Sequence, residues 1–387
     1  MYIKPQNGVA VYIMIEGANY KDRVAYLDHN ATTPIRPQAA AALAAALAAG
    51  GNPSSIHGPG RAARRTVENA RHNVAALVNA RPAQVIFTAS GTEANNQALR
   101  ATGCASAWVT AIEHDSVLKA WPDAAIVPVR PDGIVDLAAL DARLADGKAP
   151  VLVSVMLANN ETGVIQPVAE VAGLCARHGA LLHCDAVQAA GRIPIDMGAL
   201  GVDYLTLSSH KIGGAPGAGA LIARDGTPLE ALIRGGGQER GMRAGTENTP
   251  AIAAFGAAAQ LAREPLTHLA ALRDDMEARL LAAAPGARIF GKGSPRLPNI
   301  TQIAMLGVPS ETQVIALDLD GVAVSAGAAC SSGRVEPARV LLAMGVDEAT
   351  ASSAIRISLG WTTTAEDVDR LVASWCALYR RAARRAA

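Results

Sequence analysis

Two residues in the middle of the chain have the types and positions needed for covalent chemistry on an aldehyde. Asp185 ends the run LLHCD and Lys211 ends the run LTLSSHK, so each stands where an expected strand gives way to a loop. A lysine amine can hold an aldehyde cofactor as a Schiff base, and a carboxylate can keep a pyridine nitrogen protonated, so that the ring accepts electrons from a carbanion. The pair predicts a pyridoxal phosphate site, although an aspartate after a strand more often caps a helix or joins a salt bridge.

A segment upstream has the features of a phosphate site. In SGTEANN, Gly91 lets the backbone approach a ligand, Thr92 adds a hydroxyl, and a helix is expected to begin at Glu93. Hydroxyls and the backbone N–H groups of a helix N-terminus bind phosphate because they supply positive potential without a mobile counter-ion. The plainer alternative is a serine or threonine helix cap, which needs no ligand.

Between Tyr26 and Gly360 the chain carries a series of short motifs: YLDHNATTP, NPSSIHGPGR, FTASGTEANN, EHDSV, ANNETGVIQPV, HCDAVQ, SSHK, GGGQERGMRAGTEN, SAGAACSSG and IRISLG. Their content and order resemble the cysteine desulfurases of the class V aminotransferase family, of the type that serves iron-sulphur cluster assembly. The resemblance implies a fold-type I pyridoxal phosphate enzyme. Such an enzyme converts L-cysteine to L-alanine through an aldimine of the cofactor and holds the sulphur as a persulfide.

On this resemblance, further residues would surround the cofactor ring. Asp185 would pair with the pyridinium nitrogen. Asn160 and Gln188 are candidates for the phenolate oxygen, because amides can donate there without removing a proton. Asn159 is the fallback for Asn160 if the alignment shifts by one position. His114, in EHDSV, would stack on the ring and move a proton at the substrate thiol.

The resemblance also implies residues at the phosphate and at the substrate. Ser208 and His210 would bind the phosphate, and Thr246 would reach the phosphate of the neighbouring subunit, so that a homodimer builds each site. Lys211 would act as the base for the Cα proton, since a buried lysine can titrate low enough for this task. Arg356 has the planar fork that suits an α-carboxylate, with an interdomain salt bridge as its structural alternative.

Cys330 decides which reaction the site performs. Lysine and ring chemistry would serve an aminotransferase, a lyase or a desulfurase, whereas only a desulfurase needs a thiolate that takes the substrate sulphur as a persulfide. The flanking SAGAA and SSGR are rich in small, turn-forming residues, which predicts an accessible loop. The predicted acceptor is a protein such as an iron-sulphur scaffold. The resemblance also implies that Cys330 can ligate a cluster transiently during transfer.

Other functions stay open from the sequence. An aminotransferase or a selenocysteine lyase of the same fold would share everything except the emphasis on Cys330. A non-catalytic sulphur carrier would not need Lys211 and Asp185, which are both present. A metal enzyme is disfavoured, because His183, Cys184 and Asp185 alternate across a strand and cannot all face one ion. The acceptor pathway is also open among iron-sulphur assembly, nitrogenase maturation, tRNA thiolation and molybdenum cofactor sulphuration.

The bulk composition favours a small-molecule or protein partner. The formal net charge is +1, which gives no overall field for nucleic acid or a membrane surface. No apolar stretch reaches the ~20 residues of a membrane span, and the N-terminus lacks a signal-peptide pattern, so a soluble, cytoplasmic protein is expected. The five cysteines are widely spaced without a CxxC pair, which predicts reduced thiols, and all but Cys330 lie in apolar surroundings.

The elements that must position these residues follow a βαβ pattern. The apolar runs AQVIF, APVLVSVML, ALLHCDA and DYLTLSSH alternate with alanine-rich helical stretches. This alternation predicts an α/β fold with a mostly parallel sheet flanked by helices. Such sheets bind ligands at the carboxyl ends of their strands, where Gly91, Asn160, Asp185 and Lys211 are expected.

The length of 387 residues exceeds the usual size of a single core, so two domains are expected. The composition changes near residues 263–268, and the strand-like runs NITQIAML and AIRISLG beyond it predict a smaller α+β domain. We therefore predict an N-terminal extension of unknown role at 1–23, a large cofactor-binding domain at 24–262, and a small C-terminal domain at 263–387 that carries the Cys330 loop.

Overall fold

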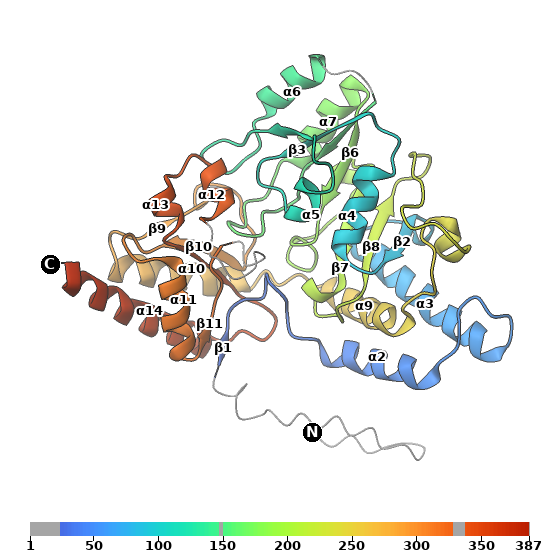
Figure 1. Ribbon diagram of the computed structural model, residues 1–387. Helices are drawn as coiled ribbons and strands as arrows, with labels where there is room; N and C mark the ends of the chain where they lie inside the picture. Colours follow the sequence, from blue (N-terminus) through green and yellow to red (C-terminus); the bar gives the residue numbers. More distant parts are fainter. Residues whose placement is uncertain (1–23, 147–149, 328–336, 387) are drawn as a thin grey trace.

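The central element of the molecule is a seven-stranded sheet with the strand order β2-β8-β7-β6-β5-β3-β4 (Figure 1). The structure is a computed structural model that describes residues 24–146, 150–327 and 337–386. Only β8 is reversed within this sheet, because it pairs antiparallel with both β7 and β2. The carboxyl ends of the other strands therefore meet at one edge, as predicted. The strands are β2 (Val85–Thr88), β3 (Ser106–Thr110), β4 (Ala125–Val127), β5 (Val151–Ser154), β6 (Leu181–Asp185), β7 (Tyr204–Ser208) and β8 (Gly219–Ala223).

Successive side chains of a strand point to opposite faces of the sheet. Both faces carry apolar side chains here, and helices cover both of them. Leu205 belongs to one apolar core and its neighbour Tyr204 to the other. Alanine and glycine allow close helix contact, since a Cβ added at Gly256 would lie 2.5 Å from Cα of Ala70. The first face is covered by α2 (Pro37–Ala49), α3 (Gly58–Leu77), α6 (Leu137–Asp146), α7 (Val168–His178), α8 (Met197–Leu200) and α9 (Thr249–Ala262), and the second by α4 (Gly91–Arg100) and α5 (Asp115–Leu118).

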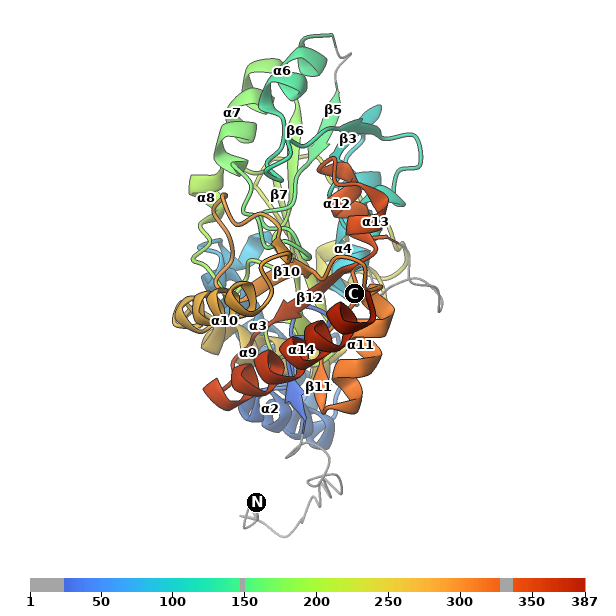
Figure 2. The ribbon, with the colours of Figure 1, turned by 90° about the vertical axis from the view of Figure 1, so that its left-hand side faces the viewer.

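A smaller unit is built on the antiparallel sheet β12-β10-β9 and faces the viewer in Figure 2. Its core surrounds the buried Trp375 and includes Ala25 and Leu27, because β1 (Ala25–Tyr26) pairs with β11 (Val322–Ala323). Its elements are β9 (Arg288–Ile289), β10 (Ile300–Ala304), β12 (Ala354–Ser358), α10 (Leu269–Ala283), α11 (Ser310–Leu319), α12 (Arg339–Ala343), α13 (Glu348–Ala351) and α14 (Ala365–Ala386). The domain limits at 24–262 and 263–387 stay a prediction, and the extension 1–23 lies outside the described residues.

Short 3-10 helices are also found within the described ranges: η1 (Pro82–Gln84), η2 (Ser209–Lys211) and η3 (Gln238–Gly241). No helix in the described part of the chain has the length and apolarity that a membrane crossing requires. The described residues likewise contain no cluster of metal-ligating side chains. Cys104, Cys175, Cys184 and Cys376 are free thiols, and all but the partly exposed Cys104 are buried.

Candidate active site

A cavity of about 350 Å³ lies at the edge of the sheet where the carboxyl ends of the strands meet. Sites for small molecules and cofactors typically measure ~300–1,000 Å³. Strand β12 of the smaller unit closes the cavity through Arg356. The lining contains most of the residues that the sequence predicted: Gly91, Thr92, His114, Asn160, Asp185, Gln188, Ser208, His210, Lys211 and Arg356.

The carboxylate of Asp185 ends β6 and is fixed by two hydrogen bonds. Its Oδ2 accepts from Nδ2 of Asn95 at 2.8 Å, and its Oδ1 accepts from the backbone N–H of Val187 at 2.9 Å. Asn95 projects from α4 and also donates to Oγ of Ser116 at 2.8 Å. Asp185 is therefore a buried, oriented carboxylate at the wall of the cavity, suited to a charge-assisted hydrogen bond with a protonated ring nitrogen.

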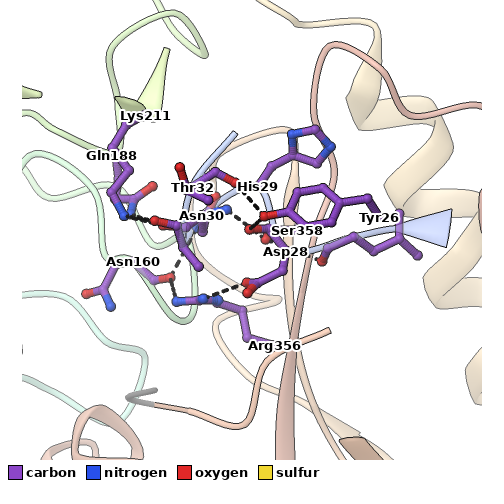
Figure 3. Close-up of polar contacts among 12 residues, drawn as sticks. Tyr26, Asp28, His29, Asn30, Thr32, Asn160, Gln188, Lys211, Arg356 and Ser358 are labelled. Carbon is purple, nitrogen blue, oxygen red and sulfur yellow. Dashed lines mark hydrogen bonds and ion pairs between the residues drawn. The ribbon is translucent and has the colours of Figure 1, made fainter. Parts of the chain in front are cut away.

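The amine of Lys211 is held by the backbone of a distant segment (Figure 3). Lys211 ends η2 directly after β7, and its Nζ donates to the carbonyl oxygens of Asn30 at 2.5 Å and Ala31 at 2.7 Å. Nε2 of Gln188 donates to the same Asn30 carbonyl at 3.1 Å. An amide nitrogen carries two N–H groups, so Gln188 can bind Asn30 and still donate into the cavity.

Asn30 also connects this site to the smaller unit, and the sequence analysis missed it. Its Nδ2 donates to the carbonyl oxygen of Asn160 at 3.1 Å, and its Oδ1 accepts from Nδ2 of Asn299 at 3.2 Å. Its backbone N–H donates to Oγ of Ser358, in β12, at 3.0 Å. The segment after β1 thus fixes the lysine amine, the Asn160 loop and β12 relative to one another.

The turn into α4 is shaped by glycines at the predicted phosphate end. Ser90 caps the helix, because its Oγ accepts from the backbone N–H of Glu93 at 3.1 Å, and the helix begins at Gly91, two residues earlier than expected. A Cβ at Gly91 would lie 3.2 Å from Cβ of Ser208, and one at Gly219 would lie 2.4 Å from the carbonyl carbon of Ser90. The turn therefore rests directly on β7 and β8, and its backbone borders the cavity.

Both histidines of the cavity have a pKa below the ordinary value of histidine, which favours their neutral forms. Burial lowers the pKa of His114, and burial together with the Lys211 charge lowers the pKa of His210 to about 4. Nδ1 of His114 accepts from the backbone N–H of Ser116 at 3.1 Å, so the ring proton of the neutral imidazole lies on Nε2. His210 can serve a phosphate as an N–H donor, while its Nδ1 lies 3.1 Å from Oγ1 of Thr32.

The two neighbouring asparagines have different tasks. Asn160, the first choice from the sequence, lines the cavity. Asn159 is fully buried, and its Oδ1 accepts from the backbone N–H groups of Glu161 at 3.0 Å and Thr162 at 2.9 Å. The side chain of Asn159 is therefore used to shape the turn that presents Asn160.

Two predicted residues are not among the described residues that line the cavity. Cys330 lies outside the described residues. Thr246 lines a separate hollow beside Glu239 and Arg243. The predicted contact of Thr246 with the phosphate of a neighbouring subunit stays a proposal.

Several lining side chains carry buried polar atoms without a hydrogen-bond partner among the described residues. Such an atom costs about 1–3 kcal/mol, which a bound ligand can offset. This pattern, with the fixed carboxylate, the amine and the helix N-terminus, fits a compact polar cofactor that carries a phosphate. The atoms are Oδ1 of Asn95, Oε2 of Glu161, Oε1 of Gln188 and Nε of Arg356.

Comparison with known proteins gives a consistent result over most of the chain. The family model for aminotransferase class-V matches residues 25–371. A cysteine desulfurase of Cereibacter sphaeroides is 44% identical over 364 residues, which cover 90% of this chain and 93% of the relative. An IscS-like cysteine desulfurase of Mycobacterium tuberculosis is 39% identical, with 89% of this chain and 94% of the relative covered.

Solved structures agree with these sequence matches. A NifS-like protein from Rickettsia africae superposes with a TM-score of 0.85 at 36% identity, covering 92% of this chain and 99% of its own. A structure titled SspA in complex with cysteine gives a TM-score of 0.75 at 26% identity and covers 86% of this chain and 98% of its own.

Proposed function

Because the chain belongs to the aminotransferase class-V family and, within it, to the cysteine desulfurases, we propose that it removes the sulphur of L-cysteine with pyridoxal 5'-phosphate as cofactor and releases L-alanine. The observation that carries the proposal is the meeting of the Asp185 carboxylate, the Lys211 amine and the N-terminus of α4 at one cavity. When bound, the cofactor would supply an electron sink for the carbanion formed at Cα.

Different lining residues would bind different parts of the cofactor. Asp185 would hold the pyridine nitrogen, and Asn160 and Gln188 would approach the phenolate oxygen. Lys211 would hold the aldehyde carbon. The phosphate would lie at the α4 turn, against Gly91, Thr92, Ser208 and His210.

The same cavity would bind the substrate and move its protons. Arg356 would hold the α-carboxylate, because its guanidinium lines the cavity and carries five N–H donors in a planar fork. Lys211 would take the proton from Cα. His114 would move a proton at the substrate thiol through Nε2, which carries the ring proton of the neutral imidazole, while Nδ1 stays bound to the backbone N–H of Ser116.

Cys330 would receive the sulphur. Its thiolate attacks the substrate sulphur, an S–S bond forms as the C–S bond breaks, and the carbon takes a proton to become alanine. No external oxidant is needed, because the sulphur atom stays on Cys330 as a persulfide. Gly327 and Arg339, which lie before and after Cys330 in the chain, both line the cavity and so support delivery there. A relative is named IscS-like, which supports an iron-sulphur scaffold as the acceptor and Cys330 as a transient cluster ligand.

Two further parts of the proposal concern assembly and location. Thr246 lies away from the cavity of its own chain, which supports a homodimer in which Thr246 of one subunit completes the phosphate site of the other. The balanced charge and the free buried thiols support a cytoplasmic location.

Product analysis with L-cysteine and added cofactor tests the proposal. We expect alanine without any need for a keto acid, a persulfide on Cys330 by peptide mass spectrometry, and, after borohydride reduction, the cofactor mass on Lys211. Cys330→Ala should abolish alanine and persulfide formation, whereas the control Cys104→Ala, at a partly exposed thiol, should keep both. Undiminished turnover in Cys330→Ala, or persulfide on another cysteine, would indicate a lyase or an aminotransferase instead.

A further inference from the structure

Arg339 begins α12 in the smaller unit and reaches across to the loop that follows β3 in the larger sheet. Its Nη1 donates to the carbonyl oxygen of Ala111 at 2.9 Å, and its Nη2 donates to the carbonyl oxygen of Glu113 at 2.6 Å. Nη2 also lies 3.7 Å from Oδ1 of Asp115. The side chain of Arg339 is 39% exposed and borders the cavity. Its guanidinium therefore contacts the loop on the side that faces the active site.

The two carbonyl oxygens lie just before His114 in the chain. The carbonyl of Glu113 belongs to the peptide group whose nitrogen is that of His114, so a hydrogen bond to this oxygen fixes the peptide plane. His114 is the N-cap residue of α5, because its Nδ1 accepts from the backbone N–H of Ser116. Arg339 therefore restrains the backbone on one side of the imidazole, and Ser116 restrains the ring on the other.

Charged groups face His114 from several elements. The carboxylates of Asp185 in β6 and Asp115 in α5 favour the imidazolium, whereas Lys211 in η2 and Arg339 in α12 oppose it. Burial remains the largest effect on the pKa of His114. The buried Glu113 next to it adds little charge at neutral pH, because its own pKa is raised to about 8 by burial. Arg339 thus supplies one of the two cations that balance two carboxylates.

We propose that Arg339 is a positioning residue for the proton transfer assigned to His114, holding the peptide between Glu113 and His114, and with it the imidazole, against the cavity. The inference rests on the proposed function of His114. Nothing in the motif pattern points to Arg339, because its acceptors are backbone oxygens. In the sequence Arg339 comes shortly after residues 328–336, which include Cys330. Its hydrogen bonds to the loop before His114 therefore link this later part of the chain to the residue proposed to transfer the proton.

Two variants separate the charge of Arg339 from its forked hydrogen bonds. In Arg339→Gln the cation is lost, and the pKa of His114 should rise. In Arg339→Lys the charge stays, so the pKa of His114 should remain near that of the natural protein. Both variants should lower kcat roughly tenfold or more with KM for cysteine nearly unchanged, because general acid–base steps depend on placement. Arg279→Gln, at a surface arginine paired with Asp275 and Asp369, is the control and should change neither quantity.

The pKa of His114 is to be read by NMR of isotope-labelled histidine in the cofactor-free protein, with the signal assigned by His114→Gln. This measurement tests whether Arg339 acts on His114, and it does not depend on the formation of alanine. A failure to form alanine would contradict the proposed function alone. In the His114→Gln background, Arg339→Gln should cause no further loss of kcat. An unchanged His114 titration in Arg339→Gln, or a fully additive loss in the double variant, would overturn the proposal.

Discussion

Oδ1 of Asp28 accepts from Nη2 of Arg356 at 2.8 Å, between the segment that follows β1 and strand β12. Nη1 of the same guanidinium donates to the carbonyl oxygen of Asn160 at 3.2 Å. Arg356 is thus an ion-pair partner within the chain as well as a cavity residue. The two roles are compatible, because a guanidinium carries five N–H donors in a fixed fork. Asp28 orients the fork, and the guanidinium still lines the cavity where a second carboxylate would bind.

Changing Arg356→Lys should raise KM for cysteine roughly tenfold or more, because one ammonium group cannot hold Asp28 and a substrate carboxylate in fixed positions. Steady-state kinetics measures KM and kcat separately. Arg296→Lys, which disturbs the buried pair with Glu277 away from the cavity, is the control and should lower stability with KM unchanged. If Arg356→Lys lowered only the melting temperature, Arg356 would have a structural role alone.

Replacing Asp185→Asn should leave a folded protein with weak cofactor retention and a rate lowered by more than about tenfold, equivalent to ~1.4 kcal/mol in the barrier. The amide keeps the shape of the side chain but removes the charge that would hold the protonated ring nitrogen. The rate of alanine formation at saturating cofactor tests this. Asp203→Asn, at the buried aspartate paired with Arg224, is the control outside the cavity. A smaller loss in Asp185→Asn than in this control would argue against the assigned role.

Glu113 should make the stability of the cofactor-free protein depend on pH. Burial raises the pKa of this carboxyl from 4.5 to about 8, although Thr110 and Met156 donate hydrogen bonds to its Oε1. The folded chain therefore binds this proton more tightly than the unfolded chain does. The resulting stabilisation is complete below pH ~4.5 and is lost as the pH rises to about 8, by at most ~1.4 kcal/mol per pH unit.

Glu113→Gln removes this titration. The free energy of unfolding of the variant should therefore increase relative to that of the natural protein as the pH rises. Urea unfolding at several pH values between about 5 and 9 measures the difference. Taking the difference cancels the opposite contribution of histidines such as His29 and His183, whose pKa values burial lowers to about 3 and about 4. A difference that does not change with pH would contradict the prediction.

Mixed dimers test whether Thr246 serves the other subunit. A dimer of one Lys211→Ala subunit and one Thr246→Ala subunit should keep one intact site, and so about half of the natural activity, because both changes fall in the same site. If Thr246 served its own chain, each site would carry one defect and the mixed dimer would be as inactive as the parent variants. Differently tagged subunits allow the mixed dimer to be purified and its alanine production measured.

Much of the site could be predicted because its chemistry depends on side-chain type. A Schiff-base lysine, a carboxylate for a ring nitrogen and a glycine at a phosphate turn are each required at a given place, so they appear as motifs at the ends of strands. The apolar runs before Asp185 and Lys211 likewise predicted β6 and β7. The reversed β8 was not predicted, because its run GALIA is short and rich in small residues.

The amino-acid sequence by itself determined the class of fold, the chemistry that we propose for the site and ten of the residues that line the cavity. Only the tertiary structure decided what holds them: the Asn30 carbonyl on Lys211, Asp28 on Arg356, and Arg339 on the loop before His114. For the Lys211 and Arg339 contacts the physical reason is that a backbone carbonyl is present at every residue, so a contact to it requires no particular side chain at the acceptor. Lys211 and Asn30 are also 181 positions apart, and only the folded chain brings such partners together.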